Sequence, residues 1–274
     1  MVVNQTDLQK HLMQMMKWFH NYCSENKIRY YALGGTMLGA VRHGGFIPWD
    51  DDIDVGIPRS DYEKLRSLIG NREIEGYYFE TPDSPAPNFR YPYGKLYDTR
   101  TSLTEHTWPS LRRGVFIDVF PLDGLGDNPE ESFQHWNSIV KKSTFLWART
   151  CAVRKKRSII KNIAIIIAHL IPNFIVSDKK LLDEMDRRCK LLDFDKCKIG
   201  GNVFGNWGKK EIMLSRIMGK PTLYQLGDIE IYGAEHADEY LTHLYVDWRK
   251  LPPAEKQVTH HDFLELDLQT PYAR

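Results

Sequence analysis

The stretch that most constrains the fold is GGFIPWDDDIDVGIP, residues 44–58, in which aspartate fills four of the five positions from 50 to 54. Apolar residues follow directly, and Ile53 and Val55 alternate with the acidic positions as in a strand that packs on a core. Residues two apart in a strand share a face, so Asp52 and Asp54 are predicted to project together. Such a pair repels unless a cation lies between the carboxylates, and oxygen ligands favour Mg²⁺ or Mn²⁺.

A third carboxylate stands in another apolar run. The segment GVFIDVFPLD places Asp118 in a predicted strand, where a charge is costly unless it is paired or binds a metal. Asp118 is therefore a candidate third metal ligand and a group that accepts a proton from an attacking hydroxyl. Asp50 and Asp51 precede the strand, which gives them supporting roles. The alternative is a simple turn at residues 50–52 and a salt bridge between Asp118 and a core arginine.

A glycine turn, LGGTMLGAVRH, precedes the acidic strand. Gly34, Gly35 and Thr36 join a predicted strand to a helix, and the free N–H groups and dipole at a helix N-terminus bind phosphate. Arg42 follows at the end of the same helix. It either contacts a phosphate through two hydrogen bonds or balances the helix dipole, and the sequence leaves both open.

Aromatic and basic residues supply further candidates. In YPYGKLYDT, Lys95 is a candidate for stabilising a leaving phosphate, and Tyr93 is a candidate for holding a quaternary ammonium group by cation–π contact. Trp49 has the same potential beside the aspartates. The alternatives are ordinary cross-strand packing for the tyrosine and a core anchor for the tryptophan. His260 and His261 are predicted either to serve the acceptor or a metal, or to lie in a surface loop.

The totals exclude several classes of protein. The 274 residues carry 37 basic and 36 acidic side chains, a net charge of +1, so we expect no nucleic-acid partner. The four cysteines form no C-x-x-C pair, which favours a reducing compartment, and we expect the protein in the cytoplasm. The N-terminus lacks the basic and apolar regions of a signal peptide, and no apolar run is long enough to span a bilayer.

The pattern of elements predicts an α/β (α+β) fold. Strands and helices mix over residues 1–125, which we expect to form the catalytic core. Long helical patterns follow, and the chain then returns to short strands, so residues 126–274 are predicted to form a helical and C-terminal acceptor-side region packed on the core.

One helical segment has an unusual composition. RKKRSIIKNIAIIIAHLIPNFIV, residues 154–176, puts four basic residues ahead of an apolar helix. It is predicted either to lie on a membrane surface, at the inner face of the membrane, or to be a buried helix with a solvated basic start.

Three motifs resemble a known family. GGTMLGAVRHGGFIPWDDDIDVGIPRSDYEKL is similar to the signature of the LicD family, which includes the fukutin-related enzymes and belongs to the nucleotidyltransferase-fold superfamily typified by DNA polymerase beta. RRGVFIDVFPLDGL and YLTHLYVDWRKLPPAEK resemble its second and C-terminal motifs. Val246 stands where that last motif is expected to have glycine, which puts a tight turn there in question.

The resemblance implies a mixed-sheet core and a phosphotransferase. Family members move phosphocholine, or a related phospho-alcohol, from a CDP-linked donor such as CDP-choline to a hydroxyl of a cell-surface glycan such as teichoic acid, lipopolysaccharide or capsule. The family's metal-binding aspartates correspond to Asp52 and Asp54, with Asp118 as the third carboxylate. A glycan or lipid-linked glycan acceptor, Mg²⁺ and release of CMP follow as expectations. The alternatives are nucleotidyl transfer that makes the CDP-alcohol or modifies another nucleotide-linked substrate, a glycosyltransferase with a D-x-D site, and an inactive scaffold.

Overall fold

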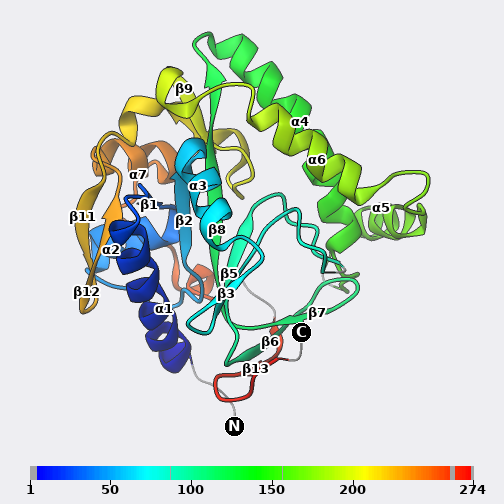
Figure 1. Ribbon diagram of the computed structural model, residues 1–274, viewed down its shortest axis with the longest axis horizontal. Coiled ribbons are helices and arrows are strands. Elements are labelled where there is room, and N and C mark those ends of the chain that lie inside the picture. The colour runs from blue at the N-terminus through cyan, green and yellow to red at the C-terminus, as the bar shows by residue number, and fades with distance from the viewer. Residues whose placement is uncertain (1–4, 87, 156, 260–262, 273–274) are drawn as a thin grey trace.

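The computed structural model describes residues 5–86, 88–155, 157–259 and 263–272 (Figure 1). It confirms the predicted α/β class, with helices around a mixed sheet. The long strand β8 runs through the middle of the molecule. The helices α1 and α2 and the β11–β12 hairpin lie on one side of it in Figure 1, and α4, α5 and α6 lie on the other.

The main sheet has the strand order β1-β2-β8-β5-β4-β3, and β9 pairs with both β8 and β10. Its strands are β1 (Tyr31–Ala32), β2 (Asp54–Pro58), β3 (Glu73–Ile74), β4 (Tyr77–Glu80), β5 (Gly94–Asp98), β8 (Phe116–Gly126), β9 (Ile199–Asn202) and β10 (Ile212–Leu214). The pairing of β2 with β8 is parallel and the other pairings are antiparallel. The strand predicted ahead of the glycine turn is thus only the two residues of β1, and the acidic strand begins at Asp54.

The remaining strands form two small sheets. The strands β6 (Ser102–Glu105), β7 (Leu111–Arg113) and β13 (Phe263–Asp267) make one, with β6 in the middle. The strands β11 (Thr222–Leu226) and β12 (Ile229–Gly233) make the hairpin.

Seven α-helices occur in the described ranges: α1 (Gln5–Glu25), α2 (Gly34–His43), α3 (Arg59–Ile69), α4 (Pro129–Thr150), α5 (Ile159–Leu170), α6 (Asp178–Cys189) and α7 (Ala237–Tyr245). Four short 3₁₀ helices join them: η1 (Phe194–Lys196), η2 (Gly208–Glu211), η3 (Ser215–Ile217) and η4 (Ala254–Lys256). Local sequence sets several of the boundaries. Asn128 begins α4 by accepting hydrogen bonds from the N–H groups of Glu130 and Glu131, with Pro129 at the first turn.

The core has two parts. The larger contains the buried residues of α1, α2 and the main sheet, including Ile53 and Val55, which are fully buried as the alternation predicts. The smaller lies between α4 and α6 and contains Ile139, Leu182 and Met185. Because β9 extends the main sheet from β8 and α7 packs on α2, segments from both sides of residue 125 pack together. The predicted division at that residue stays a prediction.

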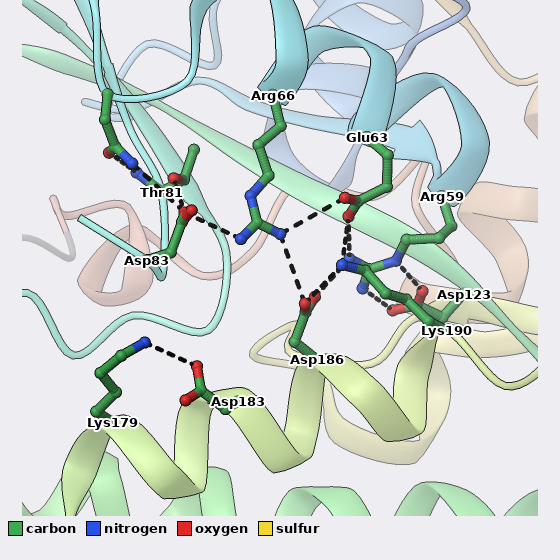
Figure 2. A network of polar contacts seen from close by, with 11 residues as sticks. Arg59, Glu63, Arg66, Thr81, Asp83, Asp123, Lys179, Asp183, Asp186 and Lys190 are labelled. Atoms are coloured by element: carbon green, nitrogen blue, oxygen red, sulfur yellow. Dashed lines mark hydrogen bonds and ion pairs between the residues drawn. The ribbon is translucent and has the colours of Figure 1, made fainter.

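A buried ion-pair network joins α3, β8 and α6 (Figure 2). The guanidinium group of Arg59 donates two hydrogen bonds to the carboxylate of Asp123, at 2.7 and 2.9 Å, and a third to Asp186 of α6 at 3.0 Å. The side chain of Asp123 is completely buried. The network therefore fixes the strand that carries Asp118 against the helical half of the protein.

The described residues include no helix with both the length and the apolarity needed to cross a bilayer. All four cysteines are free thiols.

Candidate metal and phosphate site

Two of the predicted aspartates lie side by side on neighbouring strands. Asp54 of β2 is the register partner of Asp118 of β8, and the N–H of Asp118 donates to the carbonyl of Ile53 at 3.0 Å. Asp118 is buried, and Asp54 is partly exposed where β2 begins. The parallel pairing thus brings together two carboxylates that are far apart in the sequence.

The other aspartates lie on the loop before β2. Asp50, Asp51 and Asp52 each direct a carboxylate oxygen to within 4.8 Å of the others, a spacing that suits ligands of one metal ion. The side-chain amides of Gln5 and Gln9 hold this loop, because both donate to the carbonyl of Asp50, at 3.0 and 2.7 Å. Asp52 therefore presents its carboxylate from an anchored loop rather than from the strand itself.

Burial, and after it the crowding of like charges, perturbs these carboxyl groups. Burial, followed by repulsion from Asp52 and Asp118, raises the pKa of Asp54 well above its usual range. Burial, with repulsion from Asp52, raises the pKa of Asp50 to about 8. A bound divalent cation would offset this repulsion, and an all-carboxylate donor set is what Mg²⁺ and Mn²⁺ prefer. The residues present therefore fit such an ion. The cluster at residues 50–52 is one possible set of ligands, and the predicted set of Asp52, Asp54 and Asp118 stays a prediction.

Lys95, a candidate for contacting the leaving phosphate, lies next to Asp118 and is not among the residues that line the cleft described below. It is the register partner of Asp118 across the β5–β8 pair, and its Nζ lies 3.0 Å from Asp118 Oδ1 and 3.7 Å from Glu105 Oε2. The same nitrogen lies 3.5 Å from the ring centre of Phe116, and the side chain is almost fully buried. The basic partner of Asp118 is thus a lysine, where the alternative interpretation expected an arginine.

The glycine turn packs directly against the aspartates. Gly34, Gly35 and Thr36 form the first turn of α2 rather than a loop ahead of it. A Cβ on Gly35 would lie 2.6 Å from Asp50 Oδ2, so only glycine leaves room for that carboxylate. Gly34 adopts a φ of +47°.

Two groups of this turn already have partners. The N–H of Gly34 donates to the hydroxyl of Tyr240 at 2.9 Å, and Thr36 Oγ1 accepts the N–H of Asp54, also at 2.9 Å. Both contacts hold the turn in place against α7 and β2. A phosphate would therefore meet the turn near Gly35, which lines the adjacent cleft.

A cleft of about 1010 Å³ opens beside the acidic loop. Its lining combines the acidic loop with the C-terminal motif and includes Gly35, Arg42, Trp49, Asp50, Asp52, Asp54, Trp207, Tyr245, Trp248 and Lys250. The guanidinium of Arg42 donates to the carbonyls of Trp248 and Lys250, at 2.9 and 3.4 Å, so it ties α2 to the opposite wall. Neither role considered for Arg42 from the sequence included this contact.

The C-terminal motif supplies the wall that the sequence reasoning missed. Val246 has φ +66° and ψ −70°, and the N–H of Asp247 donates to the carbonyl of Tyr245 at 2.8 Å, which together define a classic γ-turn. The tight turn therefore forms although valine replaces the expected glycine. The turn directs the chain after α7 along the cleft. The C-terminal motif was the sequence signal from which this wall of the cleft could have been predicted.

A buried carboxylate also escaped prediction. Glu211, at the end of η2, is 5% exposed, and burial raises its pKa to about 7. It adds to the negative potential at Asp54, Tyr240 and Tyr245. The burial of Glu211 could not be predicted from the sequence, because the residues around it have the composition of a short polar loop.

The structure gives different outcomes for the aromatic and histidine candidates. Trp49 both packs on the core and lines the cleft, so its two interpretations coexist. Tyr93 packs against Phe120, with ring centres 4.2 Å apart, and it does not line the cleft. His260 and His261 lie outside the described residues.

Comparisons with known proteins agree with the motifs. Residues 27–160, which include Asp52, Asp54 and Asp118, match the family described as LicD/FKTN/FKRP, nucleotidyltransferase domain. The lipopolysaccharide cholinephosphotransferase LicD of Haemophilus influenzae is 28% identical over 255 residues, covering 91% of this chain and 92% of that protein. The ribitol 5-phosphate transferase FKRP of Homo sapiens is 31% identical over 120 residues, covering 39% of this chain and 24% of that protein. The resemblance stated from the sequence is confirmed.

Proposed function

We propose that this protein, whose residues 27–160 belong to the LicD family, transfers a phospho-alcohol from a CDP-linked donor to a glycan hydroxyl. Phosphocholine is the first candidate for the transferred group, since a cholinephosphotransferase aligns with 91% of the chain. The observation that carries the proposal is the meeting of Asp50, Asp52 and Asp54 with Gly35 in one cleft. Carboxylates for a divalent cation and a helix N-terminus are what a pyrophosphate donor requires.

The reaction breaks one phosphorus–oxygen bond and forms another. The acceptor hydroxyl oxygen attacks the phosphorus that bears the alcohol, the bond from that phosphorus to the bridging oxygen breaks, and CMP leaves with that oxygen. The hydroxyl proton goes to a carboxylate, for which Asp118 is the candidate. Burial raises the pKa of this carboxyl, and the nearby Lys95 opposes that shift.

Mg²⁺ or Mn²⁺, held by Asp52, Asp54 and Asp118, would neutralise the pyrophosphate and the developing charge on CMP. The chain's own groups position the substrates. Gly35 and the N-terminus of α2 face the donor phosphates, and the contact of Arg42 with the C-terminal segment keeps the cleft walls together. The proposed fold is the nucleotidyltransferase type, in which the acidic strand β2 pairs with the central strand β8.

The aromatic wall of the cleft suits a cationic alcohol. Trp49, Trp207, Tyr245 and Trp248 all line it, and the rings of Trp207 and Tyr245 meet edge to face at 4.9 Å. Aromatic faces attract a quaternary ammonium group by about 0.5–2 kcal/mol each. The cleft therefore favours CDP-choline over donors with an uncharged polyol.

Incubation with Mg²⁺ and a panel of CDP-choline, CDP-ethanolamine, CDP-glycerol and CDP-ribitol, each with a glycan acceptor, tests the proposal. We expect CMP as the nucleotide product and the fastest release from CDP-choline. Nucleotidyl transfer is the second candidate, because the same carboxylates serve it. Formation of pyrophosphate from CTP and a phospho-alcohol, without CMP, would replace the first proposal with the second.

A further inference from the structure

The helix α5 presents an apolar face to solvent. Six of its side chains are exposed: Ile159, Ile160, Ile163, Ile166, Ile167 and Leu170. At about 100° per residue these positions fall within an arc of about 120°, and the buried Ile165 and Ala168 lie on the opposite side. The interpretation of this segment as a buried helix is therefore wrong. The inward face packs on α4, and the outward face is isoleucine.

The apolar surface continues beyond the helix. Phe174 and Ile175, on the loop after α5, are 88% and 66% exposed. Trp108 stacks on His169 of α5, and Trp147 of α4 accepts a cation–π contact from Arg157, yet both indole rings are more than half exposed. A patch of this extent marks an interaction site rather than ordinary surface.

Specific polar contacts fix this surface in place. The buried Arg149 donates to the carbonyl of Ile171 at 2.9 Å and to Asn173 Oδ1 at 2.8 Å, and it pairs with Asp178. On the other side of α5, Asn162 Nδ2 donates to the carbonyl of Arg154 at 2.9 Å. The helix and its flanking loops are thus held with the isoleucine face outward.

Charge around the patch identifies its partner. Between Glu131 and Asp178 the sequence contains eight basic residues and no acidic one, which leaves the rest of the chain net acidic. Two of these residues lead into α5, where Lys155 is exposed and Arg154 is half-exposed. A second copy of the chain would bring like charges together, whereas an anionic lipid surface complements both the basic residues and the apolar face.

We propose that α5 and the loop after it lie in the surface of an anionic lipid bilayer. The helix has 12 residues, about 18 Å, so it lies along the interface and does not cross it. The isoleucines and Phe174 enter the acyl boundary, Arg154 and Lys155 contact lipid phosphates, and Trp108 and Trp147 sit at the headgroup level. This attachment goes beyond the proposed transfer reaction and does not depend on it.

Vesicle flotation tests the proposal with the full chain. The vesicles contain phosphatidylcholine alone or with an equal part of phosphatidylglycerol. The protein is expected to float with the anionic vesicles, and added salt should weaken the binding. The triple variant Ile160→Ser, Ile163→Ser, Ile167→Ser should bind at least about tenfold more weakly, since each removed methylene lowers partitioning. The variant Arg154→Ser, Lys155→Ser should lose much of the preference for phosphatidylglycerol.

A matched control separates this patch from general hydrophobicity. Leu191, Leu223 and Leu264 are exposed leucines outside it, and their replacement by serine should leave flotation unchanged. Failure of the wild-type protein to float with either vesicle, or equal flotation of the isoleucine variant, would overturn the proposal. So would flotation of the Arg154→Ser, Lys155→Ser variant with unchanged lipid preference. A wild-type dimer that the isoleucine variant converts to a monomer, without flotation, would assign the face to a second copy instead.

Discussion

Asp54 and Asp118 are direct neighbours across a parallel strand pair, and Lys95 is the neighbour of Asp118 on its other side. One lysine and two carboxylates therefore form a row across β5, β8 and β2. The lysine pairs with Asp118 at 3.0 Å, which leaves the row net negative at the end that lies beside the cleft. This imbalance is what makes the site a candidate for a divalent cation.

Replacement of Lys95 by methionine should destabilise the protein by about 3–5 kcal/mol, because it leaves the buried Asp118 without its cation. Urea denaturation of the wild type and the variant measures this loss. The double variant Lys95→Met, Asp118→Asn should lose less than the two single changes added together, because they remove the same interaction. Strict additivity would show that the two side chains do not interact.

The variant Gly35→Ala should lower transfer activity by more than about tenfold while the protein still folds. Its Cβ would collide with Asp50, whose carboxylate must then leave its position in the cleft. Gly44→Ala is the control, since Gly44 has a φ of +60° and open space around it. It should cost about 1 kcal/mol of stability and leave activity nearly unchanged. Full activity in Gly35→Ala would remove Asp50 from the account.

The variant Arg59→Met should lower the free energy of unfolding by about 3–5 kcal/mol, because Asp123 is completely buried and would keep an unpaired charge. Arg216→Met is the matched control. Arg216 pairs with Glu239 at the surface, where solvent screens the pair, and its loss should leave the free energy of unfolding nearly unchanged. Equal losses in the two variants would contradict a structural role for the network in Figure 2.

The variant Val246→Gly should raise the thermal midpoint of unfolding. Glycine relieves the strain of the turn, about 1–3 kcal/mol, and its greater entropy in the unfolded chain costs less than that. A β-branched residue at a φ of +66° is an outlier. Val153→Gly, at an exposed valine outside the positive-φ positions, should instead lower the midpoint. A lower midpoint in both variants would show that the γ-turn stores no strain.

The sequence predicted what depends on local pattern. Alternation identified Asp54 and its buried neighbours, and the glycine turn identified the start of a helix, which is α2. The contact of Lys95 with Asp118 could not be predicted, because it depends on the register of strands that are distant in sequence. The exposure of α5 could not be predicted either, because a helix face of isoleucines has the same sequence pattern whether it packs on a protein core or on a bilayer.

The wall of the cleft that the C-terminal motif forms could be predicted only in part. Its motif was visible and its resemblance was stated, but the direction of Tyr245 and Trp248 into the cleft follows from the γ-turn at Val246 and from the contact with Arg42. A valine gives no local signal for that turn, because its usual conformations are extended or helical.

The most direct test of the central claim is calorimetric titration of Mg²⁺ or Mn²⁺ into the wild type, Asp54→Asn and, as a control, Asp228→Asn, a change in the exposed turn between β11 and β12. CMP release is measured on the same samples. The account predicts that the wild type and Asp228→Asn bind the cation and release CMP, and that Asp54→Asn binds at least about tenfold more weakly and loses turnover. Asp54→Asn that binds the cation and releases CMP as the wild type does would contradict it.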